Sequence, residues 1–185
     1  MAQKLAYYQA FGSGVLAPRG WYCFGIYGSG GSTLFVSSRP INRDQDWSNV
    51  AGPAVEFSAS DGDTSGRFEV AQVIARVFPA YRAFVQGVME MFDQPGSDYT
   101  FAPYPTDKLI LQTDRSIEYQ TPPHSEGLGT MGHFKANYDP IDGVAILEGR
   151  NPDLLMLRVR LPPEQRDLAP VIIGELLLRK RRDAR

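Results

Sequence analysis

The sequence has little of what specialised small proteins depend on. It contains one cysteine, so no disulfide can form within the chain and a disulfide-stapled scaffold is excluded. No apolar run approaches the roughly 18 residues that a membrane-spanning helix needs, so we expect no transmembrane segment. The first residues also lack the long apolar stretch of a signal peptide. Two compartments stay open: cytoplasmic, or periplasmic and otherwise extracytoplasmic if an export signal has been removed.

The charge balance lacks an excess of one sign. The chain has 19 basic and 21 acidic side chains among 185 residues, a formal net charge of −2 at pH 7. The tail at 179–185 carries a net charge of +4, so the rest of the chain carries −6. Such an acidic body disfavours broad binding to nucleic acid, so we expect no nucleic-acid partner. The basic run at 179–182 suits the C-terminal end of a helix, where cations offset the helix dipole.

Apolar residues are plentiful enough for a folded core. They make up 43% of the chain, and its length predicts a single domain over 1–185. Short apolar and aromatic runs come in adjacent pairs with turn residues between them. They predict strands near 21–27, 32–37, 54–58, 108–112, 116–120, 144–148 and 154–161. Because the strands pair as hairpins rather than alternating with helices, we predict an α+β fold with a mostly antiparallel sheet and helices on one face.

Two helices are expected to pack on this sheet. Between Val70 and Met91, apolar side chains recur in steps of three and four, which predicts a helix over 66–92. Pro79 falls inside it and removes one backbone donor, so we expect a kink near Phe78 or a division into two helices. A second, C-terminal helix is predicted near 168–182.

Three local patterns carry further expectations. In 154–161, leucine and valine alternate with Arg158 and Arg160, which is typical of a half-buried strand. The glycine-rich run at 28–31 lacks the lysine of a phosphate-binding loop, so we predict a hairpin turn of four residues. Cys23 lies in the middle of a predicted strand, and we expect a small buried side chain rather than a nucleophile.

One turn resembles the start of a calcium-binding EF-hand loop. Asp61, Asp63 and Ser65 supply oxygen at alternate positions, and the acidic Glu69 follows in the ninth position. The twelfth position is Gln72 instead of a bidentate glutamate, so any calcium site should be weak. The alternative is a strand-to-helix turn whose polar side chains cap the helix. No other cofactor is expected.

Two further groups of residues are candidates for a site. His124 and His133 lie in one glycine-rich loop with Glu126 and Asp139, which is enough for general acid–base chemistry or a metal site. The alternative is that both histidines are ordinary surface residues. Tyr99, Phe101 and Tyr104 lie in an aromatic loop and are candidates for binding a ligand. The alternative is that they pack against the core under a long loop.

These patterns give three hypotheses for function. Since no cofactor fingerprint, nucleophile motif or basic face is present, the leading one is a non-catalytic domain that binds a small ligand or a protein partner. The second is a small hydrolase or metal-assisted enzyme using the His124/His133 loop. The third is a homo-oligomeric structural subunit, joined through an exposed edge of one hairpin.

Overall fold

The computed structural model describes residues 3–41, 49–91 and 99–183. The chain begins with β1 (Leu5–Ala10), β2 (Ser13–Pro18), β3 (Tyr22–Gly28), β4 (Gly31–Ser37) and β5 (Ala54–Ser60). Next come α1 (Arg67–Val77), the 3-10 turn η1 (Pro79–Tyr81) and α2 (Arg82–Met91). The second half contains β6 (Lys108–Gln112), β7 (Ser116–Thr121), η2 (Leu128–Thr130), β8 (Ile141–Glu148), β9 (Asp153–Arg160), η3 (Pro163–Leu168) and α3 (Ala169–Asp183).

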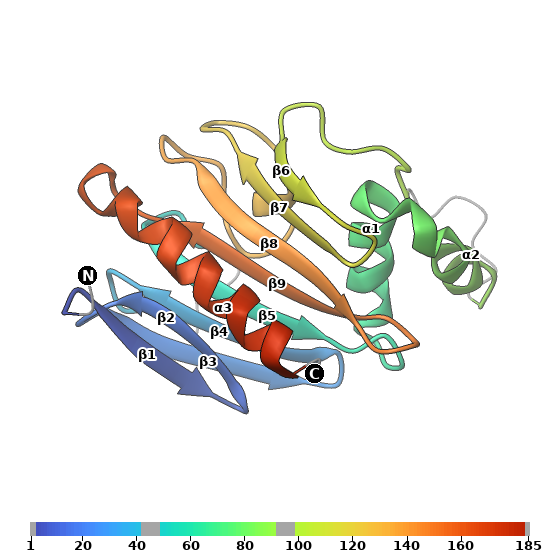
Figure 1. Ribbon diagram of the computed structural model, residues 1–185, viewed down its shortest axis with the longest axis horizontal. Helices are drawn as coiled ribbons and strands as arrows, with labels where there is room; N and C mark the ends of the chain where they lie inside the picture. Colours follow the sequence, from blue (N-terminus) through green and yellow to red (C-terminus); the bar gives the residue numbers. More distant parts are fainter. Residues whose placement is uncertain (1–2, 42–48, 92–98, 184–185) are drawn as a thin grey trace.

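Seven strands form one sheet in the order β3-β4-β5-β9-β8-β7-β6, and β1 and β2 form a separate hairpin (Figure 1). Every neighbouring pair is antiparallel. Two runs of consecutive strands, β3 to β5 and β6 to β9, are joined by the long-range pairing of β5 with β9. The predicted α+β class is confirmed. The glycine-rich hairpin also forms, with a shorter loop than predicted, because Gly28 pairs directly with Gly31.

The sequence does not predict the N-terminal hairpin of β1 and β2. Its turn is Phe11-Gly12, and both residues have a positive φ, of 48° and 77°. Such turns match the right-handed twist of the flanking strands. β2 buries Val15 and Ala17 completely, whereas β1 is mostly half-buried or exposed. β1 has the sequence LAYYQA, in which apolar and polar residues do not alternate, so the pattern does not predict a strand there.

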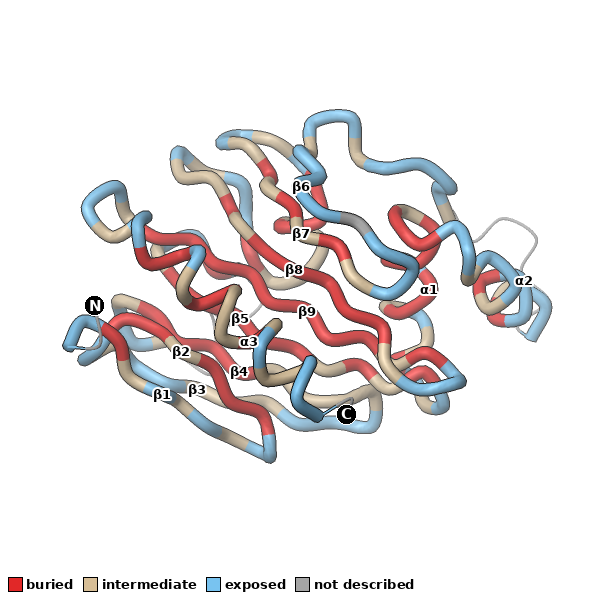
Figure 2. Tube along the Cα trace, viewed as in Figure 1, coloured by how far each residue is buried: buried red, intermediate tan, exposed pale blue. Residues whose placement is uncertain are grey.

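The helices cover both faces of the sheet, which corrects the expectation that they lie on one face. Successive residues of β8 show the arrangement. Val144 and Ile146 belong to the apolar cluster under α3, whereas Ala145 and Leu147 belong to the cluster under α1. Because side chains alternate across a strand, the two clusters lie on opposite sides. The central strands are therefore buried on both faces, and Figure 2 shows β8 and β9 buried along most of their length.

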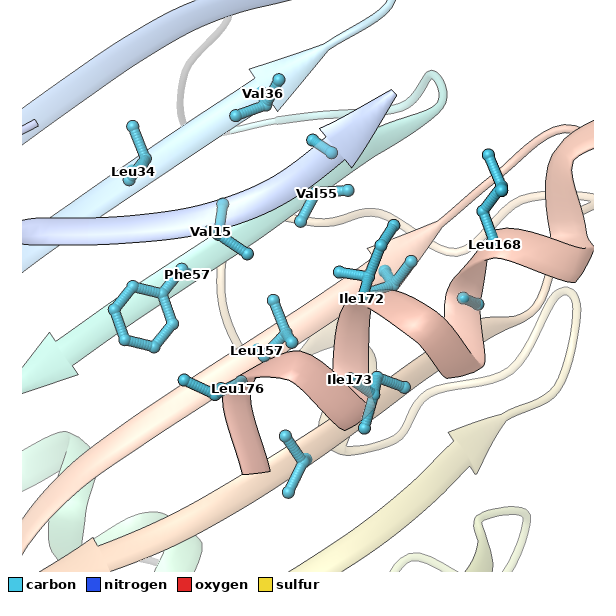
Figure 3. Close-up of a cluster of buried hydrophobic side chains, with 14 of the residues drawn as sticks. Val15, Leu34, Val36, Val55, Phe57, Leu157, Leu168, Ile172, Ile173 and Leu176 are labelled. Carbon is cyan, nitrogen blue, oxygen red and sulfur yellow. The ribbon is translucent and has the colours of Figure 1, made fainter. Parts of the chain in front are cut away.

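α3 packs with the β1–β2 hairpin on one face of the sheet. Figure 3 shows Ile172 and Leu176 of α3 beside Leu157 of β9, with Val15 of β2 nearby. Leu168, Ile172 and Leu176 are spaced by four residues, so they line one side of the helix, as the sequence predicts. Complete burial of each such side chain contributes roughly 1.5–3 kcal/mol to the free energy of unfolding.

Pro79 divides the predicted helix 66–92, as expected. α1 ends at Val77, Pro79 opens η1, and α2 begins at Arg82. Proline is tolerated there because the first turn of a helix leaves its amide groups without intrahelical partners. Residue 92, at the predicted end of this helix, lies outside the described residues.

Two expectations about individual strands are wrong. β9 is not half-buried, because it lies between two covered faces, and Arg158 and Arg160 are both 0% exposed. Cys23 is exposed rather than buried, because β3 is an outer strand of the sheet. Within the described ranges, no helix combines the length and the apolar character needed to cross a membrane.

Candidate functional site

A row of polar groups crosses the sheet face that lies under α1. The register places Glu56 of β5, Arg158 of β9, Gly143 of β8 and Tyr119 of β7 side by side. We call these four residues the polar row. Arg158 Nη1 donates to Glu56 Oε1 at 2.7 Å, and both side chains are buried. Close pairing is needed here, because an unpaired charge in a protein interior costs several kcal/mol.

Helix α1 and the loop after β7 close over the polar row. Arg158 Nε donates to the carbonyl of Leu128 at 3.3 Å. Arg158 Nη2 lies 3.8 Å from Glu69 Oε1 on α1. From the loop, His133 Nδ1 lies 3.4 Å from the same Glu56 oxygen that Arg158 contacts. The polar row therefore ties the helix and the loop to the centre of the sheet.

The charges in the polar row support one another. Burial would raise the pKa of Glu56, but Arg158 and His133 outweigh it and hold that pKa below its ordinary value. Burial would lower the pKa of Arg158, but the Glu56 carboxylate raises it above its ordinary value. Burial also raises the pKa of the Tyr119 hydroxyl, which has no hydrogen-bond partner among the described residues. At neutral pH the row is thus an ionised pair beside a neutral phenol.

The lowered pKa of Glu56 predicts a dependence of stability on pH. The unfolded chain binds a proton at Glu56 near pH 4.5, whereas the folded chain binds it only at a lower pH. Between these two values the unfolded state holds more protons, so the stability of the fold should decrease as the pH falls. Thermal unfolding followed by circular dichroism should show a steeper loss of melting temperature below pH 4.5 in the wild type than in Glu56→Gln.

Two other carboxylates matter for that measurement, one as an opposing contribution and one as a control. Burial raises the pKa of Asp107, so this group contributes a trend of the opposite sign and is present in both proteins. The exposed Glu164 supplies a matched control, because Glu164→Gln should keep the wild-type slope. Equal slopes in the wild type and Glu56→Gln would contradict the assignment to Glu56.

The structure places the two histidines in different surroundings. His133 contacts Glu56 and lies edge-on against the ring of Phe35, at 5.0 Å between ring centres. His124 packs edge-on against Tyr138, at 4.5 Å. The two rings thus have separate partners, one in the polar row and one in the surface loop.

The two acidic residues of the predicted histidine site make separate contacts. Asp139 accepts a hydrogen bond from Arg166 at 2.6 Å. The backbone carbonyl of Glu126 accepts a hydrogen bond from Thr106 at 2.8 Å. Hydrolase chemistry at this loop stays a prediction.

The predicted calcium turn makes contacts with other protein groups. Asp61 Oδ1 accepts from the backbone amide of Asp63 at 2.7 Å, and Asp63 Oδ1 accepts from the side chain of Asn151. The Ser65 hydroxyl contacts a serine of the β3–β4 turn at 3.0 Å, and Glu69 accepts from Ser60. Across the described ranges, no three His, Cys, Asp or Glu side chains are grouped to hold a metal ion. Weak calcium binding stays a prediction.

The aromatic loop lies against α1 and α2. Tyr99 and Tyr104 pack against the apolar cluster under α1. The Arg76 guanidinium lies 4.0 Å from the centre of the Tyr104 ring, and Arg82 lies 4.2 Å from that of Phe101. Tyr99 and Tyr104 thus pack under the loop, whereas Phe101 is 38% exposed. A ligand-binding role for the three residues stays a prediction.

The outermost strand on the β6 side presents a run of apolar side chains. Leu109, Ile110 and Leu111 follow one another in β6 and are all exposed. The register with β7 shifts between Leu109 and Leu111, so Ile110 has no partner residue in β7. Such a bulge interrupts the row of backbone groups with which another strand could pair. Another molecule would therefore contact the side chains of β6 rather than its backbone. Ile110 is the most accessible of them, at 66% exposed.

A groove of about 620 Å³ lies beside this strand, between β6–β8 and the end of α3. In Figure 1, α3 lies in front of the sheet, with β6 and β7 to one side of it. Charged side chains of both signs line the groove, from Arg115, Glu118, Arg181 and Asp183. Its apolar lining comes from Leu111, Ile146, Leu147 and Leu177. We call this groove, together with Ile110 and Leu111, the β6 patch. Leu109 lies opposite Tyr119 and so faces the α1 side of the sheet.

Neither the polar row nor the β6 patch was identified from the sequence. One signal was available for the polar row, because a glycine inside a strand, here Gly143, often marks a close approach of another group. For the patch, the run of three apolar residues in 109–111 gives no indication of whether its strand is central or at an edge. No family model, curated protein or solved structure matches this chain, so its function is argued from these geometries.

Proposed function

We propose that this chain is a non-catalytic domain that binds a protein partner through the β6 patch. The observation that carries the proposal is the exposure of Ile110 and Leu111 in succession at the edge of the sheet, with Leu111 lining an adjacent groove. Contiguous exposed apolar surface is rare on monomeric proteins and marks interaction sites. A partner that covers this surface gains the free energy of burying it.

The chemistry of the patch suits a protein surface as the ligand. Apolar side chains and charged side chains of both signs line the groove together. Protein interfaces also combine buried apolar contacts with polar ones. One pair of charges is already made within the chain, because Lys180 Nζ lies 3.2 Å from Glu148 Oε2. The partner would therefore contribute apolar side chains to the groove.

A peptide library provides the test of partner binding. Linear peptides displayed on phage are selected on sparsely immobilised protein, and the recovered peptides are synthesised and titrated by fluorescence anisotropy. We expect sequences rich in apolar residues, whose dissociation constants rise by about tenfold or more in Ile110→Asp. The reason is that a carboxylate at this position would be desolvated when the patch is covered.

A matched control distinguishes binding at this site from nonspecific binding to exposed apolar residues. Leu178 is a similarly exposed aliphatic residue, at 57%, and lies on α3 outside the lining of the β6 groove. Leu178→Asp should leave peptide binding unchanged. If every selected peptide binds the wild type and Ile110→Asp equally well, the proposed function is wrong.

A further inference from the structure

We infer that the partner of the β6 patch is a second copy of this chain, docked about a twofold axis that lies between Ile110 and the groove. This inference rests on the proposed function and identifies its partner. It is carried by the juxtaposition of a projecting apolar side chain with an apolar groove on one surface.

The shape of the patch is self-complementary. Ile110 lies at the bulge in β6 and is 66% exposed, and the next residue in the chain, Leu111, lines the groove. A twofold interface brings the same patch of two copies together, so each part of the patch must meet its complement in the other. A protrusion and a groove side by side satisfy that condition, because a half-turn places each Ile110 over the groove of the other copy.

The charges of the patch also suit a copy of itself. The groove lining carries Arg115 and Arg181 as well as Glu118 and Asp183. A lining of one sign would repel an identical one, whereas a mixed lining can pair its cations with the carboxylates of the other copy.

The bulge indicates side-chain docking rather than a continuous sheet between the copies. A regular antiparallel pairing of two β6 strands would need side chains opposite one another to share a face. The register shift at Ile110 breaks this alternation, so the two strands cannot form an uninterrupted ladder. The contact is therefore expected through Ile110 and the groove.

Sedimentation velocity of the full chain measures the association directly. Across roughly 1–200 μM, a range that covers weak and moderate homodimers, the wild type should shift from monomer to dimer. Ile110→Asp should raise the dimer dissociation constant by about 30-fold or more, as expected for a central buried side chain. Leu178→Asp should dimerise like the wild type. Circular dichroism verifies that each variant is folded.

Cysteine cross-linking tests the docking geometry. The only cysteine, Cys23, is exposed, so all proteins carry Cys23→Ser. Ile110→Cys on one copy should form a disulfide with Glu118→Cys, in the groove lining, on the other copy when the two variants are mixed. A mixture of Ile110→Cys with Leu178→Cys should cross-link much more slowly.

The outcomes separate this inference from the proposed function. A wild type that stays monomeric, while selected peptides bind in a manner that depends on Ile110, would overturn the second copy as partner and leave partner binding in place. A dimer unaffected by Ile110→Asp would overturn the inference as well. Dimer formation that depends on Ile110 and cross-linking from Ile110→Cys to Glu118→Cys would support it.

Discussion

Replacing Arg158 with methionine is expected to lower the free energy of unfolding by about 3–5 kcal/mol. The variant leaves the Glu56 carboxylate buried without the guanidinium that now donates to it at 2.7 Å. It also removes the hydrogen bond to the carbonyl of Leu128, which holds η2 to the sheet. Urea unfolding followed by circular dichroism measures the loss, and the midpoint should move to lower urea concentration.

A second variant separates the charge from the packing. In Glu56→Gln with Arg158→Met, no charge of the pair is left buried, so part of the lost stability should return. Arg150→Met removes an exposed arginine from the β8–β9 turn and should change the stability by less than about 0.5 kcal/mol. If Arg158→Met is no more destabilising than Arg150→Met, the polar row does not hold the fold in the way argued here.

Local patterns in the sequence were sufficient for most of the sheet and for the division of the first long helix. Turn residues and short apolar runs marked the hairpins from β3 onward, because a strand pair that is adjacent in sequence needs little more. Pro79 marked the helix boundary because its effect on the backbone is local. The layering of helices on both faces is not local, since it depends on how α1 and α3 connect to distant strands.

The buried arginines show where local reasoning fails. Arg158 and Arg160 alternate with apolar residues, and the same alternation is produced by a strand with one face in water. A buried arginine differs from an exposed one in having a buried carboxylate as partner. For Arg158 that partner is Glu56, which lies 102 residues away in the chain. Arg160 instead donates to the backbone carbonyls of Val50 and Gly52, more than a hundred residues earlier. No window of neighbouring residues contains this information.

The candidate site was predictable only in part. His133 was selected as a candidate with chemical potential, and the structure places it in contact with Glu56, a partner that no motif indicated. The β6 patch depends on a fact that the sequence does not contain, namely that β6 ends the sheet. The run 109–111 would equally suit a strand buried between two neighbours. Only the strand order shows that these side chains face solvent.

Replacing Gly143 with alanine is expected to lower the free energy of unfolding by about 3 kcal/mol, the upper end of the range for overpacking. A Cβ atom at this position would lie 2.4 Å from the hydroxyl oxygen of Tyr119 and 2.5 Å from the carbonyl oxygen of Leu157. The carbonyl belongs to the neighbouring strand and cannot move without disturbing the ladder. Urea unfolding again provides the measurement.

Gly174 supplies the matched control for this substitution. A Cβ atom there would meet nothing within 4 Å, and the residue lies inside α3. Gly174→Ala should therefore stabilise the protein by about 0.5–1 kcal/mol, since alanine favours a helix over glycine. If the two substitutions change the free energy of unfolding in opposite directions, the loss at Gly143 comes from the close approach of Tyr119 and the Leu157 carbonyl. A neutral Gly143→Ala would contradict the packing described for the polar row.

The same variant links the polar row to the β6 patch. Tyr119 is the register partner of Leu109, the residue that precedes Ile110 in β6. A Cβ atom at Gly143 would push the Tyr119 ring, and the displacement would reach Leu109 through the β6–β7 ladder. Gly143→Ala should therefore weaken dimerisation in sedimentation velocity as well as lower stability, whereas Gly174→Ala should leave dimerisation unchanged. The exposed strand would then depend on the buried row for its shape, because both belong to one cross-strand line of residues.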